Sequence, residues 1–108
     1  MNQPYATEQP ARSDIAALPG LVALDFGTDW CGHCTAAAPH IAVALADWPA
    51  LRHIKVEDGS GRVLGRSFGV TLWPTVVLLR DGREVARVVR PADPAAVRAA
   101  LADAAMAK

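Results

Sequence analysis

The sequence predicts a single α/β domain, in which a central mixed sheet of about four to five strands carries helices on both faces. Three observations support this fold class. Residues 21–26 and 75–79 are apolar runs of strand length, too uniformly apolar for a sheet with one solvated face. Asp81-Gly82 separates the second run from a segment of alternating charge, as in a β-hairpin. Alanine-rich segments of helical spacing follow the first run and the hairpin.

The chain of 108 residues has the size of one domain, so we treat 1–108 as a single unit. Residues 1–12 are turn-rich and are expected to be irregular, with at most a short strand near Tyr5. Ser13 or Asp14 is the expected N-cap of a short helix that ends at Pro19-Gly20.

The first strand is expected at 21–26, and the helix after it is expected to end near Trp48. Residues 51–57 alternate like a strand, and 58–61 have the composition of a turn. A short helix is predicted over 63–68.

The last elements carry clear end signals. Pro74 opens the second apolar strand, and residues 83–90 return from the hairpin as an antiparallel edge strand whose charges prevent pairing with other molecules. Asp93 is the expected N-cap of the final helix, and Pro94 is its first residue.

Composition argues against several classes of function. The formal net charge is zero, so the chain has no excess of positive charge with which to bind nucleic acid or an anionic membrane. Residues 1–12 lack the regions of a secretory signal, and the first apolar run is too short to span a bilayer. Two cysteines do not build the disulfide framework of a small secreted protein. We therefore expect a cytoplasmic protein, and we expect a monomer.

Both cysteines lie in the stretch WCGHC, residues 30–34, a spacing that suits a metal site, a staple or a redox pair. Cys31 is placed at the junction of a strand and a helix N-terminus, where the helix dipole stabilises a thiolate. Cys34 lies one turn further in and is sheltered. An exposed attacking thiol and a sheltered resolving thiol are what thiol–disulfide exchange requires.

A metal site is the alternative use of these cysteines. Zinc takes four ligands, and Cys31, His33 and Cys34 cannot all close on one ion while they start a helix. A homodimer could supply four cysteines, so a metal or docking module remains an open alternative. We expect no metal and no cofactor. No nucleotide or flavin motif is visible, so the electrons are expected to come from a partner.

Six features follow one another along the chain: the strand LVALDF with Asp25, WCGHC, Pro39 five residues after Cys34, Lys55, Pro74-Thr75 and Gly82. With this ordered set, the chain resembles the thioredoxins over nearly its whole length. The resemblance implies a thioredoxin fold and a thiol–disulfide oxidoreductase with a redox-active Cys31–Cys34 pair.

The resemblance also implies roles for residues outside the motif. Asp25 would be a buried proton acceptor for Cys34, and Lys55 would be its charge partner; the alternatives are an aspartate bonded to backbone amides and a solvated lysine. Pro74 would be cis and would present the backbone of Trp73 to an extended substrate, rather than simply starting a strand. The expected substrate-binding residues are Trp30, Gly32, Trp73 and Pro74.

Two positions depart from the thioredoxin pattern. His33 replaces a proline, which makes CGHC look like the motif of protein disulfide isomerases. A protonated His33 could donate to the Cys31 thiolate and make the couple more oxidising; otherwise it is an inert exposed side chain. Gly27 replaces a tryptophan, and we hypothesise that Trp73 either covers the vacated space or narrows the substrate groove.

The leading hypothesis is a reductase of protein disulfides, with electrons supplied by a thioredoxin reductase or a glutathione system. A disulfide oxidase or isomerase is the alternative within the same chemistry, and a binding module is the alternative outside it. His40 and His53 are expected at the surface, and we assign them no function.

Overall fold

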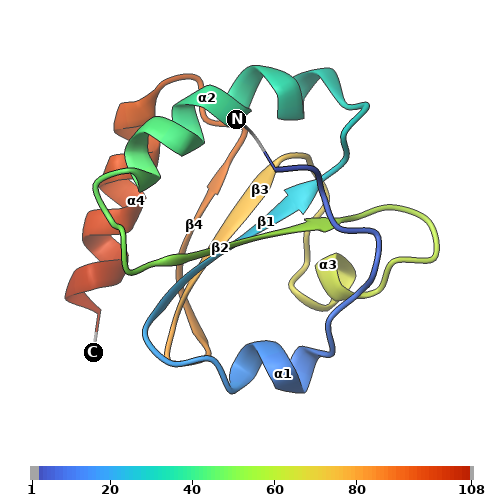
Figure 1. The fold of residues 1–108 in the computed structure, drawn as a ribbon, viewed down its shortest axis with the longest axis horizontal. Helices are drawn as coiled ribbons and strands as arrows, with labels where there is room; N and C mark the ends of the chain where they lie inside the picture. The colour runs from blue at the N-terminus through green and yellow to red at the C-terminus, as the bar shows by residue number, and fades with distance from the viewer. Residues whose placement is uncertain (1–2, 108) are drawn as a thin grey trace.

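A four-stranded mixed sheet forms the centre of the computed structural model, which describes residues 3–107 (Figure 1). Its strands lie in the order β2-β1-β3-β4. The inner strand β1 pairs in parallel with β2 and antiparallel with β3, and β3 pairs antiparallel with β4. The predicted α/β class with a mixed sheet is confirmed. The bounds are β1 (Leu21–Gly27), β2 (Arg52–Glu57), β3 (Thr75–Arg80) and β4 (Arg83–Val89).

Helices cover both faces of the sheet. In Figure 1 the long helices α2 and α4 lie on one side, and the short helices α1 and α3 lie on the other. Among the described residues, no helix is long and apolar enough to cross a membrane. The helices are α1 (Arg12–Ala16), α2 (Gly32–Leu45), α3 (Leu64–Ser67) and α4 (Pro94–Met106).

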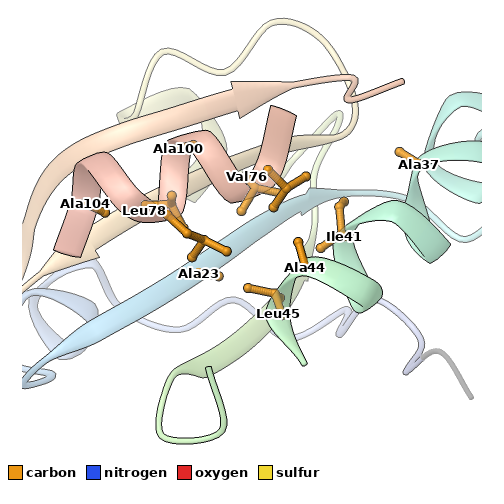
Figure 2. Packing of buried hydrophobic residues seen from close by; sticks show 11 residues of the cluster. Ala23, Ala37, Ile41, Ala44, Leu45, Val76, Leu78, Ala100 and Ala104 are labelled. Carbon is orange, nitrogen blue, oxygen red and sulfur yellow. The ribbon is translucent and has the colours of Figure 1, made fainter. Parts of the chain in front are cut away.

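The core consists of two apolar clusters, one on each face, because alternate residues of β1 point in opposite directions. Val22 and Phe26 pack towards α1 and α3. Ala23 packs with α2 and α4, where several alanines let the helices approach the sheet closely (Figure 2). Asp25 is buried on the strand between these apolar residues, and a buried carboxylate indicates a role other than apolar packing.

Several element ends differ from those predicted. α1 starts at Arg12, after Ala11 as N-cap, so the expected caps Ser13 and Asp14 lie inside the helix. The strand expected near Tyr5 is reduced to a single parallel bridge between Ala6 and Val56. α2 ends at Leu45, three residues before Trp48, because the chain turns there through hydrogen bonds to the last helical carbonyls.

The hairpin and the final helix form as predicted. Asp81 and Gly82 have φ of 50° and 83°, the left-handed backbone that a tight two-residue turn requires. The Asp93 side chain accepts a hydrogen bond from the backbone N–H of Ala96, and Pro94 follows as the first helical residue.

Gly82 is the glycine least able to accept a side chain. An added Cβ would lie 2.1 Å from the backbone oxygen of Ala16, whereas at Gly20, with φ of 73°, no atom lies within 4 Å. Both substitutions to alanine incur the left-handed backbone cost, about 1–2 kcal/mol. We expect Gly82→Ala to lower the free energy of unfolding by at least about 1 kcal/mol more than Gly20→Ala, measured by urea denaturation. Equal losses would contradict the close contact with α1.

Candidate active site

The two cysteines stand at the start of α2 in unequal surroundings. Cys31 is the N-cap and is partly exposed, whereas Cys34 lies in the first turn and is only 3% exposed. Both are free thiols. The predicted asymmetry between an accessible and a sheltered sulfur is therefore confirmed.

The surroundings of Cys31 favour its thiolate. Partial burial alone would raise the pKa of Cys31, but the backbone N–H groups of Cys34 and His33, the Cys34 thiol and the positive charge of Arg90 together lower it. The thiolate is the nucleophilic form of cysteine. The surroundings of Cys31 thus favour the nucleophilic form of its sulfur.

The surroundings of Cys34 favour its thiol. Burial raises the pKa of Cys34 to about 11, and the neighbouring Cys31 adds to the effect, while hydrogen bonds from the Thr28 backbone and the Tyr5 hydroxyl act in the opposite direction. Cys34 therefore still carries its proton when Cys31 is already ionised.

Alkylation of the reduced protein should reveal this order. With iodoacetamide, we expect Cys31 to react with a pH midpoint below the ordinary cysteine value of about 8.5, since its thiolate is stabilised. Cys34 should stay unmodified until the pH approaches about 11. Mass spectrometry of proteolytic fragments after timed labelling measures both profiles. Equal labelling of both residues at neutral pH would contradict the assignment.

Asp25 is 2% exposed and makes its hydrogen bonds to two side chains. Its Oδ1 accepts a hydrogen bond of 2.9 Å from the Tyr5 hydroxyl, and its Oδ2 lies 2.9 Å from His53 Nε2. These side-chain partners replace the backbone amides of the alternative interpretation.

The predicted pairing of Asp25 with Lys55 is wrong. Lys55 Nζ donates to the backbone oxygen of Gln3 at 2.6 Å and lies 4.4 Å from the centre of the Tyr5 ring. Among the described residues the ion-pair partner of Asp25 is His53. Residues two apart on a strand share a face, so His53 and Lys55 of β2 both lie on the side of Asp25. Because His53 lies two residues before Lys55 on the same strand, the sequence could have identified His53 as a second candidate partner of Asp25.

Tyr5 fills the space that Gly27 leaves open. A Cβ at Gly27 would lie 2.8 Å from the Tyr5 ring and 2.6 Å from Cys34 Sγ. Tyr5 is only 6% exposed, and its backbone N–H is held by Asp29. The hypothesis that Trp73 covers this space is therefore wrong. Tyr5 was missed because it lies far upstream in an irregular segment.

Trp73 packs instead against Trp30, the residue that precedes Cys31. The two rings meet edge to face with centroids 5.8 Å apart, and Trp73 Nε1 donates to Asp58 at 2.9 Å. The Trp73–Pro74 peptide is cis, in agreement with the resemblance. The backbone oxygen of Trp73 accepts a hydrogen bond of 2.7 Å from Arg90 Nε.

Gly32 and His33 are exposed at the helix start. His33 reaches Cys31 through its backbone N–H, and within residues 3–107 no hydrogen bond joins the imidazole to the thiol. Nor does this part of the chain bring together three or more histidine, cysteine, aspartate or glutamate side chains that could hold a metal ion.

Comparison with known proteins agrees with this geometry. The thioredoxin family model matches residues 5–103. A thioredoxin of Mycolicibacterium smegmatis is 32% identical over 101 residues, covering 91% of this chain and 90% of that protein. Thioredoxin-1 of Saccharomyces cerevisiae is 39% identical over 83 residues, or 76% of this chain and 79% of that protein.

The solved structure of thioredoxin 2 from Pseudomonas aeruginosa PAO1 in its reduced form is also similar. It has a TM-score of 0.86 and 54% identity, and the match covers 96% of each chain. The chain therefore belongs to the thioredoxin family and is a thiol–disulfide oxidoreductase.

Proposed function

We propose that this oxidoreductase works as a reductase of protein disulfides, with Cys31 as the attacking and Cys34 as the resolving residue. The observation that carries the proposal is the opposite perturbation of the two thiols, which lowers the pKa of Cys31 and raises that of Cys34. Such a difference sets the order of the two steps.

In the first step the Cys31 thiolate attacks a substrate disulfide, forms a mixed disulfide and releases one substrate thiolate. In the second step Cys34 loses its proton and attacks the Cys31 sulfur. The Cys31–Cys34 disulfide forms, and the second substrate thiolate leaves. Two electrons pass from the cysteine pair to the substrate. Asp25, which is buried and linked to Cys34 through the Tyr5 hydroxyl, is the proposed acceptor of the Cys34 proton.

The proposed substrate groove lies beside the cis peptide. An extended segment would pair with the backbone of Trp73 next to Pro74, above Gly32. The Trp73 carbonyl is held by Arg90, so the substrate would displace or share that hydrogen bond. The exposed Trp30 and its partner Trp73 narrow the groove on one side.

The remaining site residues have supporting roles in this proposal. Lys55 contributes a positive charge to the cavity that Asp25 and His53 also line. His33 is exposed and leaves the helix start open to solvent.

The oxidised cysteine pair would be reduced again by an external electron donor, either a thioredoxin reductase or a glutathione system. In this proposal the protein works in the cytoplasm and as a monomer.

Insulin reduction tests the proposal. The protein is mixed with insulin and NADPH, and either a thioredoxin reductase or glutathione with glutathione reductase is added. We expect catalytic NADPH consumption and precipitation of the insulin B chain with one of the two donors. If neither donor supports turnover above the rate without the protein, the reductase proposal is wrong.

A further inference from the structure

The polar side chains behind Cys34 form a continuous line of contacts. The Tyr5 hydroxyl interacts with the Cys34 thiol and donates to Asp25 Oδ1 at 2.9 Å. On the far side of the carboxylate, Asp25 Oδ2 lies 2.9 Å from His53 Nε2. The line therefore runs from the reacting sulfur through Tyr5 and Asp25 to His53.

The two ends of the line differ in access to solvent. Tyr5 and Asp25 are 6% and 2% exposed, whereas the His53 side chain is 28% exposed. His53 also lines a cavity of about 290 Å³ between β2 and α2. A proton that leaves Cys34 thus meets two buried groups before it reaches one that can exchange with water.

From these contacts we infer that the Tyr5 hydroxyl transfers the Cys34 proton to Asp25, and that His53 controls how readily Asp25 accepts it. The inference deepens the proposed function and rests on it, because it concerns the resolving step. Tyr5 touches the reacting thiol and is a catalytic residue. His53 acts through Asp25 and is a positioning residue.

The proton transfer balances along this line. The Cys34 S–H gives its proton to the Tyr5 oxygen, and the Tyr5 O–H gives its own proton to Asp25 Oδ1. Tyr5 ends as a hydroxyl, and Asp25 ends as a neutral acid. When the external donor reduces the disulfide again, the proton returns to Cys34 by the reverse route.

The charge on His53 determines how readily Asp25 accepts the proton. A protonated imidazole beside Asp25 stabilises the carboxylate and makes it a poor proton acceptor, whereas a neutral imidazole leaves it a better one. Of the other titratable groups, Tyr5 contacts Asp25, Lys55 lines the same cavity, and Cys34 adjoins Tyr5; the α2 residues lining the cavity, Ala38, Ile41 and Ala42, are apolar. We therefore expect the resolving step to accelerate as the pH rises through neutrality.

Stopped-flow reaction of the reduced protein with an aromatic disulfide, 5,5′-dithiobis(2-nitrobenzoate), separates the two steps. Attack by Cys31 releases the first coloured thiolate, and resolution by Cys34 releases the second. For Tyr5→Phe, which keeps the ring, we expect an unchanged first phase and a second phase slower by about 10²-fold, the typical size of a general acid–base contribution.

For His53→Gln we expect the second phase to lose its dependence on pH across neutrality, because the glutamine amide carries no charge at any of these pH values. His40→Gln is the matched control, because His40 lies on α2 and, among the described residues, makes no hydrogen bond or ion pair with Asp25. It should keep the wild-type profile. Near-ultraviolet circular dichroism confirms that each variant is folded.

Two results would overturn the inference: a second phase of Tyr5→Phe within about twofold of wild type, or a His53→Gln profile that keeps the wild-type pH dependence. Failure of the proposed function looks different, because the wild-type protein would then support no insulin turnover with either donor, whatever the two stopped-flow phases of the variants show.

Discussion

Replacing Cys31 by serine is expected to abolish disulfide reduction, with a loss on the order of 10³-fold or more, as is typical when an enzyme loses its nucleophile. The physical reason is that Cys31 supplies the stabilised thiolate, and a serine hydroxyl at the same N-cap does not ionise near neutral pH. The measurement is the rate of insulin reduction with dithiothreitol as the electron donor. The fold should be unaffected, since Cys31 is partly exposed and serine is a good N-cap residue.

Cys34→Ser is the matched variant and should fail at a different point. Cys31 can still attack, so the protein should accumulate as a stable mixed disulfide with its substrate. Mass spectrometry under non-reducing conditions detects that adduct. Adducts on Cys31→Ser but not on Cys34→Ser would reverse the assigned roles of attacking and resolving cysteine.

Tyr5→Ala is expected to lower the free energy of unfolding by about 3 kcal/mol, within the range measured for removing a buried aromatic ring. The ring is buried against Gly27 and Cys34, and its hydroxyl satisfies one oxygen of the buried Asp25. In a domain of this size the loss corresponds to a fall in Tm of roughly 10 °C or more. Urea denaturation and calorimetry of the reduced protein measure both quantities.

Two further variants identify the source of that loss. Tyr5→Phe should cost less, about 1–2 kcal/mol, because it removes only the hydrogen bond to Asp25. Gly27→Ala should be less destabilising when Tyr5 is already alanine, because one of its two clashes is then absent. Additive effects of the two substitutions, or a loss below about 1 kcal/mol for Tyr5→Ala, would show that Tyr5 does not fill this space.

Much of the fold could be predicted because its signals are local. The first strand was predicted at 21–26 and is observed at Leu21–Gly27, since an apolar run of that length has few other structures. Asp81-Gly82 identified the hairpin through the backbone angles these residues tolerate. The CxxC spacing at a helix start likewise favoured a redox pair of Cys31 and Cys34 over a metal site.

The side chains that contact the buried Asp25 carboxylate could not be predicted in the same way. Tyr5 reaches Asp25 only because an irregular segment lies along β2, held in register by one bridge at Ala6. The choice between His53 and Lys55 as the partner of Asp25 depends on side-chain reach across a sheet, which alternation alone does not decide. Both contacts are long-range consequences of packing.

The reduction potential of the Cys31–Cys34 pair, equilibrated with glutathione buffers at neutral pH, tests the proposed reductase most directly. We expect a value near that of thioredoxin, about −270 mV, because the His33 imidazole makes no hydrogen bond to Cys31 within residues 3–107. A value of about −180 mV or higher would contradict the reductase and indicate an oxidase or isomerase. The absence of any reversible couple would contradict a redox function of the pair altogether.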